Sequence, residues 1–233
     1  MSRLGWWTGV VALVLVLPMT HEARAGAPTD QLKGAIDRVV KTLDDPILKG
    51  EDKQGERRRA VRRIANDIFD WPEIARRSLA RHWQPLTEQQ RTEFVGLFAD
   101  LLERSYISKI ELYGGEKILY TGERIDGDLA SVSTRIITKN GTEVPVDYRM
   151  LKRGDRWLVY DVNIEGVSLV SNYRTQFNKI IQTASYNDLV QKMKTKQGEL
   201  TAEDQGAQKK AAPVMLTGAT FLFELLLPKL TRG

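Results

Sequence analysis

The clearest structural pattern of the sequence lies in residues 117–164, KILYTGERIDGDLASVSTRIITKNGTEVPVDYRMLKRGDRWLVYDVNI. It contains four strand-like runs, 117–125, 129–138, 142–152 and 156–164, separated by the hairpin-type dipeptides Asp126-Gly127, Asn140-Gly141 and Gly154-Asp155. In the second run, Val132, Thr134 and Ile136 alternate with Ser133 and Arg135. This period of two predicts a four-stranded antiparallel meander with one apolar face, which other elements must cover.

On both sides of this stretch, apolar residues recur every three or four positions, which predicts helices. The expected helices run from Asp30 to Leu43, over 57–68, from Trp71 to about Arg81, from Thr87 to Ile110, over 170–181 and over 185–193. Thr87 and Gln90 have the spacing of a capping box, so the helix that they begin is the most clearly marked. The sequence therefore predicts an α+β fold in which a helical layer packs on the sheet.

The first 25 residues have the pattern of a secretory signal peptide. Arg3 precedes an apolar run from Trp6 to Leu17, and Ala23-Arg24-Ala25 supplies small residues at the cleavage spacing. The run has about 12 residues, whereas a membrane-spanning helix needs roughly 20, so cleavage is favoured over a membrane anchor. We therefore expect residues 1–25 to be removed and the mature protein to be periplasmic.

The mature chain is expected to form one domain over residues 27–200, followed by residues 201–233 as a polar linker and an apolar tail. The tail contains Gly218, Glu224 and Pro228 and is too short and interrupted to cross a bilayer comfortably. Docking on a subunit, interfacial anchoring, blocking of a pocket and a poorly ordered extension all stay open for it.

Composition narrows the classes of function. The chain has no cysteine, which excludes disulfides, thiol nucleophiles and thiolate metal sites. Loss of residues 1–25 lowers the formal net charge from +5 to +4, which is mild for a nucleic-acid-binding protein. His82 is the only histidine after residue 25, so neither a histidine metal cluster nor a Ser-His-Asp arrangement is expected. We expect no metal and no cofactor.

An enzyme is the main alternative, because Asp147, Tyr148, Tyr160 and Asp161 offer acids and bases near an apolar face. In a regular strand, however, Asp147 lies on the polar side and Asp161 points away from Tyr160. No motif has the spacing of a catalytic site, and no catalytic residue is predicted.

Motifs across residues 30–197 resemble the MlaC family, which is also called the toluene-tolerance auxiliary family. The resemblance rests on Asp70-Trp71-Pro72-Glu73, Ala75, Leu79, Trp83, Thr87, Gln90, Phe94, Phe98, Leu102, Tyr106, Trp157, Tyr160-Asp161-Val162, Gly166-Val167-Ser168, Asn172-Tyr173-Arg174 and Phe177. The chain departs from the family pattern at Ala80, where glycine is usual, and in the segment after about residue 200.

The resemblance implies a nuclear-transport-factor-like fold with phospholipid acyl chains in an apolar pocket between the helices and the sheet. It also implies shuttling of lipid between an outer-membrane lipoprotein complex and an inner-membrane ABC transporter with its substrate-binding ring, in support of outer-membrane lipid asymmetry. A non-transporting periplasmic scaffold, tethered to a membrane or partner by the C-terminal tail, is the second interpretation.

The predicted lipid-binding residues combine the apolar sheet face with the facing helices. They are Ile68, Ile74, Leu79, Phe94, Phe98, Leu101, Tyr106, Val132, Ile136, Val144, Val146, Tyr148, Met150, Tyr160, Val162, Tyr173 and Phe177. For Arg76, Arg77, Arg149 and the basic run at 57–63, contact with lipid phosphate and a solvated surface role are both open. Arg174 is expected to pair with Asp161, a suggestion that comes from the resemblance.

Overall fold

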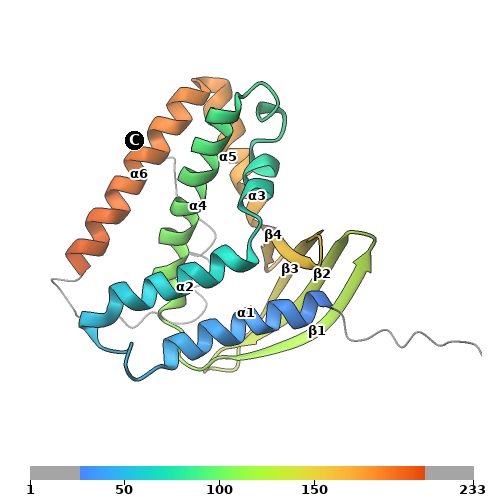
Figure 1. Ribbon diagram of the computed structural model, residues 1–233, viewed down its shortest axis with the longest axis vertical. Coiled ribbons are helices and arrows are strands. Elements are labelled where there is room, and N and C mark those ends of the chain that lie inside the picture. Colours follow the sequence, from blue (N-terminus) through green and yellow to red (C-terminus); the bar gives the residue numbers. More distant parts are fainter. Residues whose placement is uncertain (1–26, 208–233) are drawn as a thin grey trace, which may run out of the picture.

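The structure, a computed structural model, describes residues 27–207. Its sheet is built from β1 (Lys117–Asp126), β2 (Leu129–Ile137), β3 (Glu143–Arg153), β4 (Arg156–Ile164) and the short β5 (Val167–Ser168). All neighbouring strands are antiparallel and follow the order of the sequence. The predicted four-stranded meander is confirmed, and β5 adds a two-residue strand at its edge. Figure 1 shows the long, curved hairpins of this sheet.

The strand register defines an inner face of the sheet, which α1 and α2 partly cover. Val132 lies opposite Tyr148, Thr134 opposite Val146, and Val146 opposite Ile164. The register between β3 and β4 shifts at Arg149 and Met150, because β4 is bulged there. Tyr160 lies in this bulge and packs into the helical bundle, away from the inner face.

Residues 27–207 contain six α-helices: α1 (Ala27–Asp44), α2 (Gln54–Ile68), α3 (Trp71–Leu79), α4 (Glu88–Ile110), α5 (Leu169–Thr183) and α6 (Tyr186–Ala207). Short 3-10 turns, η1 (Glu51–Lys53) and η2 (Ala80–His82), precede α2 and follow α3. The capping box at α4 is confirmed, because the Thr87 side chain accepts from the Gln90 amide and the Gln90 side chain accepts from Thr87. Helix α6 continues to Ala207, so the polar sequence after Gly198 is helical up to that point and not a linker.

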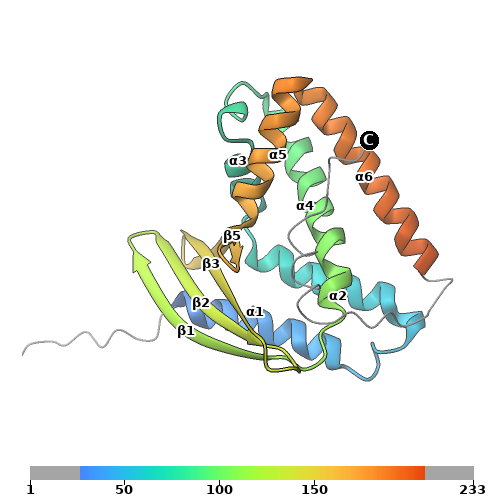
Figure 2. The same ribbon diagram turned by 180° about the vertical axis from the view of Figure 1, so that it is seen from behind.

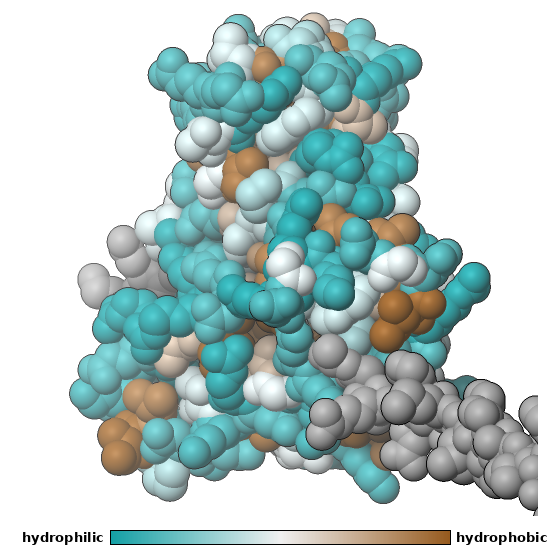
Figure 3. All heavy atoms as spheres, turned by 45° about the vertical axis from the view of Figure 1, so that its right-hand side comes forward, coloured by the Kyte–Doolittle hydropathy of each residue, from teal (hydrophilic) through white to brown (hydrophobic). Residues whose placement is uncertain are grey.

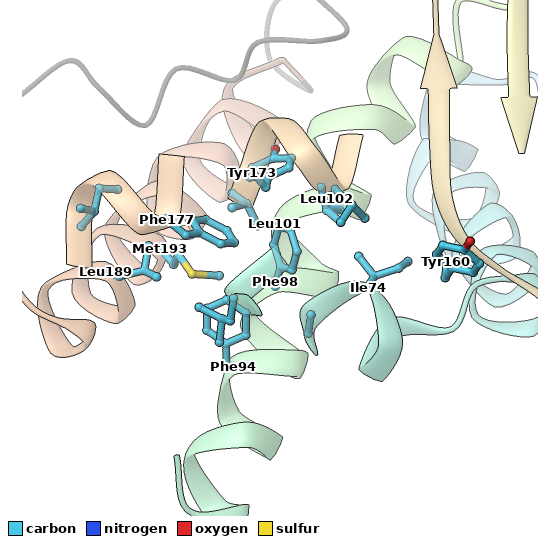
Figure 4. Close-up of a cluster of buried hydrophobic side chains, with 14 residues drawn as sticks. Ile74, Phe94, Phe98, Leu101, Leu102, Tyr160, Tyr173, Phe177, Leu189 and Met193 are labelled. Atoms are coloured by element: carbon cyan, nitrogen blue, oxygen red, sulfur yellow. The ribbon is translucent and has the colours of Figure 1, made fainter. Parts of the chain in front are cut away.

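Helices α3 to α6 form a bundle with an aromatic core, which stands beside the sheet in Figures 1 and 2. The rings of Phe94, Phe98, Tyr173 and Phe177 pack against one another, with centroids 4.9 to 5.7 Å apart. Figure 4 shows these side chains converging from α4 and α5, with Leu189 and Met193 entering from α6. Edge-to-face pairs of this kind add to the stabilisation from apolar burial.

The bundle is joined to the sheet through the start of α3. The Asp70 amide donates to the Val159 carbonyl at 2.8 Å, and Arg153 at the end of β3 pairs with the Asp70 carboxylate at 2.8 Å. The same carboxylate caps α3 by accepting from the Glu73 amide. The Arg77 guanidinium lies 4.0 Å from the centre of the Tyr160 ring. These contacts fix the orientation of α3 relative to β4.

Ala80, where the family pattern has glycine, adopts a backbone conformation that favours glycine. Its φ is 49° and its ψ is −118°. An L side chain is strained in this region, whereas glycine enters it freely. The departure at Ala80 therefore costs stability at the turn between α3 and η2.

None of the helices within residues 27–207 has the length and apolar character required to cross a bilayer. The predicted signal peptide, 1–25, and the apolar tail lie outside the described residues.

Candidate functional site

The strongest candidate for a ligand-binding surface is an apolar group on the inner face of the sheet, which we call the sheet cluster. It consists of Ile136, Val144, Val146, Tyr148, Val162 and Ile164. All six come from β2, β3 and β4, and no helix among the described residues contributes a hydrophobic side chain to this cluster. Val144 and Val146 are nevertheless almost fully buried. The cluster therefore differs from a core formed between two packed layers.

The adjoining part of the inner face is covered by helices. Leu32 and Ala35 of α1, with Ile64 and Ile68 of α2, pack on a sheet surface made from Ala130, Val132, Met150, Trp157 and Val159. Tyr148 and Val162 contact both this group and the sheet cluster. One end of the inner face is thus closed by α1 and α2, and the sheet cluster forms the other end.

The structure divides the seventeen predicted lipid-binding residues into three sets. Ile136, Val144, Val146, Tyr148 and Val162 belong to the sheet cluster. Ile68, Val132 and Met150 pack between the sheet and helices α1 and α2. Ile74, Leu79, Phe94, Phe98, Leu101, Tyr160, Tyr173 and Phe177 lie in the core of the bundle, and Tyr106 packs against it.

The predicted residues therefore do not all line one shared space. We call the eight residues in the bundle core, together with Tyr106, the bundle set. Their ring contacts are those of a filled core, since the centroid of the Phe98 ring lies within 5.7 Å of the centroids of three other rings. Helical periodicity showed which side of each helix is apolar, but not that α3 to α6 bury these sides against one another. Ile164 belongs to the sheet cluster and was missed, although it continues the alternation of β4 two residues after Val162.

The sheet cluster contains no charged side chain. Beside it on the inner face, the buried Thr134 hydroxyl donates to the Val146 carbonyl at 2.9 Å. Burial raises the pKa of the Tyr148 phenol to about 12, so this side chain stays neutral at physiological pH. Such a surface can hold hydrocarbon but provides no charge to bind an anionic group.

The arginines considered as phosphate ligands are paired with carboxylates. Arg76 and Arg77 both bond Glu73, at 2.6 and 2.7 Å, and Arg149 pairs with Asp161 at 3.3 Å. Hydrogen bonds from Arg76 and Arg77 hold the pKa of Glu73 at about 2. These groups stabilise the fold around α3 and β4.

The expected pair between Arg174 and Asp161 is wrong. Arg174 donates instead to the Arg77 carbonyl at 2.9 Å. Asp161 accepts from Arg149, from the Ser168 hydroxyl at 2.6 Å and from the Val170 amide at 3.0 Å. Sequence reasoning found the carboxylate but assigned the wrong arginine, because cross-strand neighbours depend on the register of β3 and β4.

The basic run of α2 is largely used in contacts with α4. Arg57 and Arg58 pair with Glu111, and Arg62 pairs with Glu103 at 2.6 Å. Arg59 and Arg63 remain exposed.

A groove of about 630 Å³ between α1 and α2 is lined by Arg38, Lys41, Thr42, Asp45, Leu48, Ala60, Arg63, Ile64, Asn66 and Asp67. Seven of these ten lining residues are polar or charged, so the groove is not a purely apolar site for acyl chains.

The surface seen in Figure 3 is mainly hydrophilic, with separate hydrophobic patches. Large exposed apolar side chains elsewhere in the described chain include Ile47, Ile125 and Leu129. Isolated apolar side chains of this kind are common on protein surfaces and do not by themselves mark a site.

The residues weighed for catalysis do not assemble into a reactive group. Asp161 is held by the three donors described above, and Asp147 lies opposite Ser133 and Asn163, off the inner face. His82 lies 3.0 Å from the Asn178 side-chain oxygen. Between residues 27 and 207, no three acidic, histidine or cysteine side chains gather in a way that would hold a metal ion.

Comparisons with known proteins agree on one family. The family described as MlaC protein matches residues 33–195. The chain is 23% identical over 197 residues to the "Intermembrane phospholipid transport system binding protein MlaC" of Haemophilus influenzae, covering 81% of this chain and 91% of that protein. It is 24% identical over 201 residues to the "Toluene tolerance protein ttg2D" of Pseudomonas putida, covering 85% and 93%.

A solved structure with the same fold carries a ligand. The phospholipid-binding protein from Ralstonia solanacearum, in complex with a phospholipid, is 26% identical and has a TM-score of 0.66. The match covers 76% of this chain and 99% of that one.

Proposed function

We propose that this chain, which belongs to the MlaC family, is a periplasmic carrier that shuttles phospholipid between the outer and inner membranes. The family is one of lipid-binding transport proteins and not of enzymes. Phospholipid is therefore the ligand class, and acyl chains are the part of the ligand that needs an apolar surface. The proposal includes the periplasmic location and the shuttle role, and it specifies no direction of transport.

The sheet cluster is the single observation that best supports the proposal. It is a contiguous apolar group whose described members all come from strands, whereas α1 and α2 supply apolar contacts elsewhere on the inner face. We place an acyl chain against this group. The Ralstonia solanacearum protein, which shares the fold, binds a phospholipid. We assign acyl-chain contact to the six residues of the sheet cluster and treat the bundle set as core.

The energetic need for such a surface is large. At about 0.8 kcal/mol per methylene, two chains of about sixteen carbons lose on the order of 20 kcal/mol on leaving a bilayer for water. An apolar protein surface removes most of this cost. On β3 the sheet cluster extends over five residues, from Val144 to Tyr148, or about 16 Å at roughly 3.3 Å each. This length is close to the roughly 15 Å depth of one leaflet.

The absence of charged side chains from the sheet cluster also supports an orientation for the lipid. A charged phosphate group would not be stabilised on the sheet cluster, because burial of a charge without a counter-charge is unfavourable. We propose that the headgroup stays in water at the edge of the sheet, while the chains lie on the sheet cluster. This arrangement leaves the headgroup accessible to the proposed donor and acceptor complexes, an outer-membrane lipoprotein complex and an inner-membrane ABC transporter with its substrate-binding ring.

Native mass spectrometry tests the proposal. The protein purified without detergent is expected to carry phospholipid in a whole-number ratio, and solvent extraction is expected to release the same lipid. Repeated preparations with no bound lipid, together with no uptake from added vesicles, would contradict a carrier. In that case the scaffold interpretation, in which the tail outside the described residues tethers the protein, would take its place.

A further inference from the structure

The sheet cluster is buried more deeply than its described apolar neighbours explain. Val144, Val146 and Ile164 are 1%, 3% and 6% exposed. Neighbours within one sheet shield the flanks of a side chain, whereas its tip is covered by an element that lies on the face of the sheet. Among residues 27–207, no helix supplies a hydrophobic side chain to this cluster. A further apolar segment is therefore expected on this face.

The chain after Ala207, which lies outside the described residues, contains a segment of this character. Ten of the fourteen residues 214–227 are apolar, among them Phe221 and Phe223, and Glu224 is the only charged one. Such a segment is stabilised by leaving water, and so is the sheet cluster when no lipid lies on it. The sheet cluster has no charged side chain, so the two surfaces match in character.

The described chain ends on the side of the bundle at which α4 also ends. The Tyr186 hydroxyl at the start of α6 donates to the Gln90 carbonyl near the start of α4, at 3.1 Å. Further along both helices, the Gln197 side chain donates to the Asp100 carboxylate at 2.6 Å. The two helices therefore run in the same direction, as Figures 1 and 2 show. Beyond the second contact they continue for the same number of residues, to Ala207 in α6 and to residue 110 in α4.

The end of α4 leads directly to the sheet cluster. The chain continues from α4 into β1, where Ile118 lies opposite Ile136, and Ile136 lies opposite Val144. Residues 208–213 separate α6 from the apolar segment and, when extended, span up to about 20 Å at 3.3 to 3.6 Å per residue. This exceeds the roughly 10 Å between the axes of packed helices. The apolar segment can therefore pass the end of α4 and return to the sheet.

We propose that residues 214–227 cover the sheet cluster when no phospholipid is bound, and that acyl chains displace them. This inference rests on the proposed function and adds a regulatory contact to the same site. Because the segment belongs to the same chain, its effective concentration at the sheet is in the millimolar range. It keeps the apolar face out of water after a lipid has been delivered. It also competes with lipid, and the apparent affinity for lipid falls in proportion to the fraction of molecules whose sheet cluster is uncovered.

Crosslinking in the lipid-free full-length chain tests the contact. Benzoylphenylalanine would replace Phe223, and adducts would be located by peptide mass spectrometry after irradiation. Replacement of Lys209, in the polar part that precedes the segment, is the control. We expect position 223 to form adducts within residues 136–164 and position 209 to form none there. Loading with dipalmitoylphosphatidylcholine should abolish the adducts of position 223.

A pair of charged variants of the full chain measures the competition. Phe221→Glu/Phe223→Glu places two charges in the segment, which the uncharged sheet cluster cannot accommodate. Gln208→Glu/Ala211→Glu adds the same charge before the segment and is the matched control. For a segment that covers the sheet cluster in about nine tenths of lipid-free molecules, its release raises the affinity for dipalmitoylphosphatidylcholine about tenfold. The control should bind this lipid as the parent does.

Several results would overturn the inference. Adducts of position 223 with a second protein molecule, or only outside residues 136–164, would assign the segment another binding surface. Adducts that persist in the lipid-loaded protein would show that lipid does not displace it. Equal affinity of Phe221→Glu/Phe223→Glu and the parent would exclude competition, and a lower affinity would show that the segment helps to hold the lipid. A parent protein that binds no phospholipid would instead refute the proposed function, and the adducts of the lipid-free protein would still report the contact.

Discussion

Val146→Trp places an indole ring on the proposed acyl-chain surface. Val146 is the central member of the sheet cluster, with Thr134 opposite it on β2 and Ile164 opposite it on β4. It is 3% exposed, and its side chain points to the inner face. The larger ring must therefore occupy volume that the account assigns to lipid. We expect lipid loading to fall while the secondary structure is retained.

The size of the effect follows from the length of chain that the ring displaces. An indole covers a stretch of about three to four methylenes on the sheet surface. At about 0.8 kcal/mol each, this removes about 3 kcal/mol of binding free energy, or about a hundredfold in affinity. Overpacking of the fold itself would cost a similar amount of stability, so binding and unfolding must be measured separately.

The assay is displacement of a fluorescent phospholipid from the purified protein, with unfolding in urea measured in parallel. Ser133→Trp is the control, because Ser133 pairs with Asp147 on the opposite face of the same strands. The control should bind lipid as the parent does. Unchanged affinity in a folded Val146→Trp protein, or an equal loss in Ser133→Trp, would refute the assignment of the inner face.

Three further predictions concern the bundle, the α2–α4 contact and the α3 turn. Phe98→Ala should lower the free energy of unfolding by about 3 to 5 kcal/mol in urea titrations. The lipid-to-protein ratio of the folded fraction should stay unchanged, and a lower ratio would show that the bundle core contributes to lipid binding. Burial raises the pKa of Glu103 from 4.5 to about 7. Between pH 4.5 and about 7 the folded state therefore binds more protons than the unfolded state, and the free energy of unfolding falls as the pH rises through this range. Glu103→Gln should remove about 3 kcal/mol of this pH-dependent loss of stability, and an unchanged slope in pH-dependent urea titrations would contradict it. Ala80→Gly should raise the free energy of unfolding by about 1 kcal/mol, because glycine accepts a φ of 49°, and a lower value would show that the turn is unstrained.

The sheet was predictable because its signals are local. Asn140-Gly141 and Gly154-Asp155 mark two hairpins, and Gly141 and Gly154 have the positive φ that such turns require. The alternation along β2 and β3 then placed Val132, Val144 and Val146 on one face, as observed. Local turn chemistry and a period of two were sufficient for this part of the fold.

The location of the site was less predictable, because it depends on contacts between distant segments. The apolar side of α4 is visible in Phe94 and Phe98, but the sequence does not tell whether that side meets the sheet or α5. The bulge that turns Tyr160 towards α3 has no sequence signature of its own. The extension of α6 to Ala207 lies in a polar sequence, in which hydrophobic periodicity gives no signal for a helix.

Photo-crosslinking can show directly which residues contact the acyl chains of a bound phospholipid. A phosphatidylcholine with a diazirine near the end of one acyl chain would be loaded into the protein, irradiated, and the adducts located by peptide mass spectrometry. We expect adducts within residues 143–164, on β3 and β4. Adducts confined to the α4 and α5 segments that form the bundle core, residues 94–102 and 173–177, would contradict it.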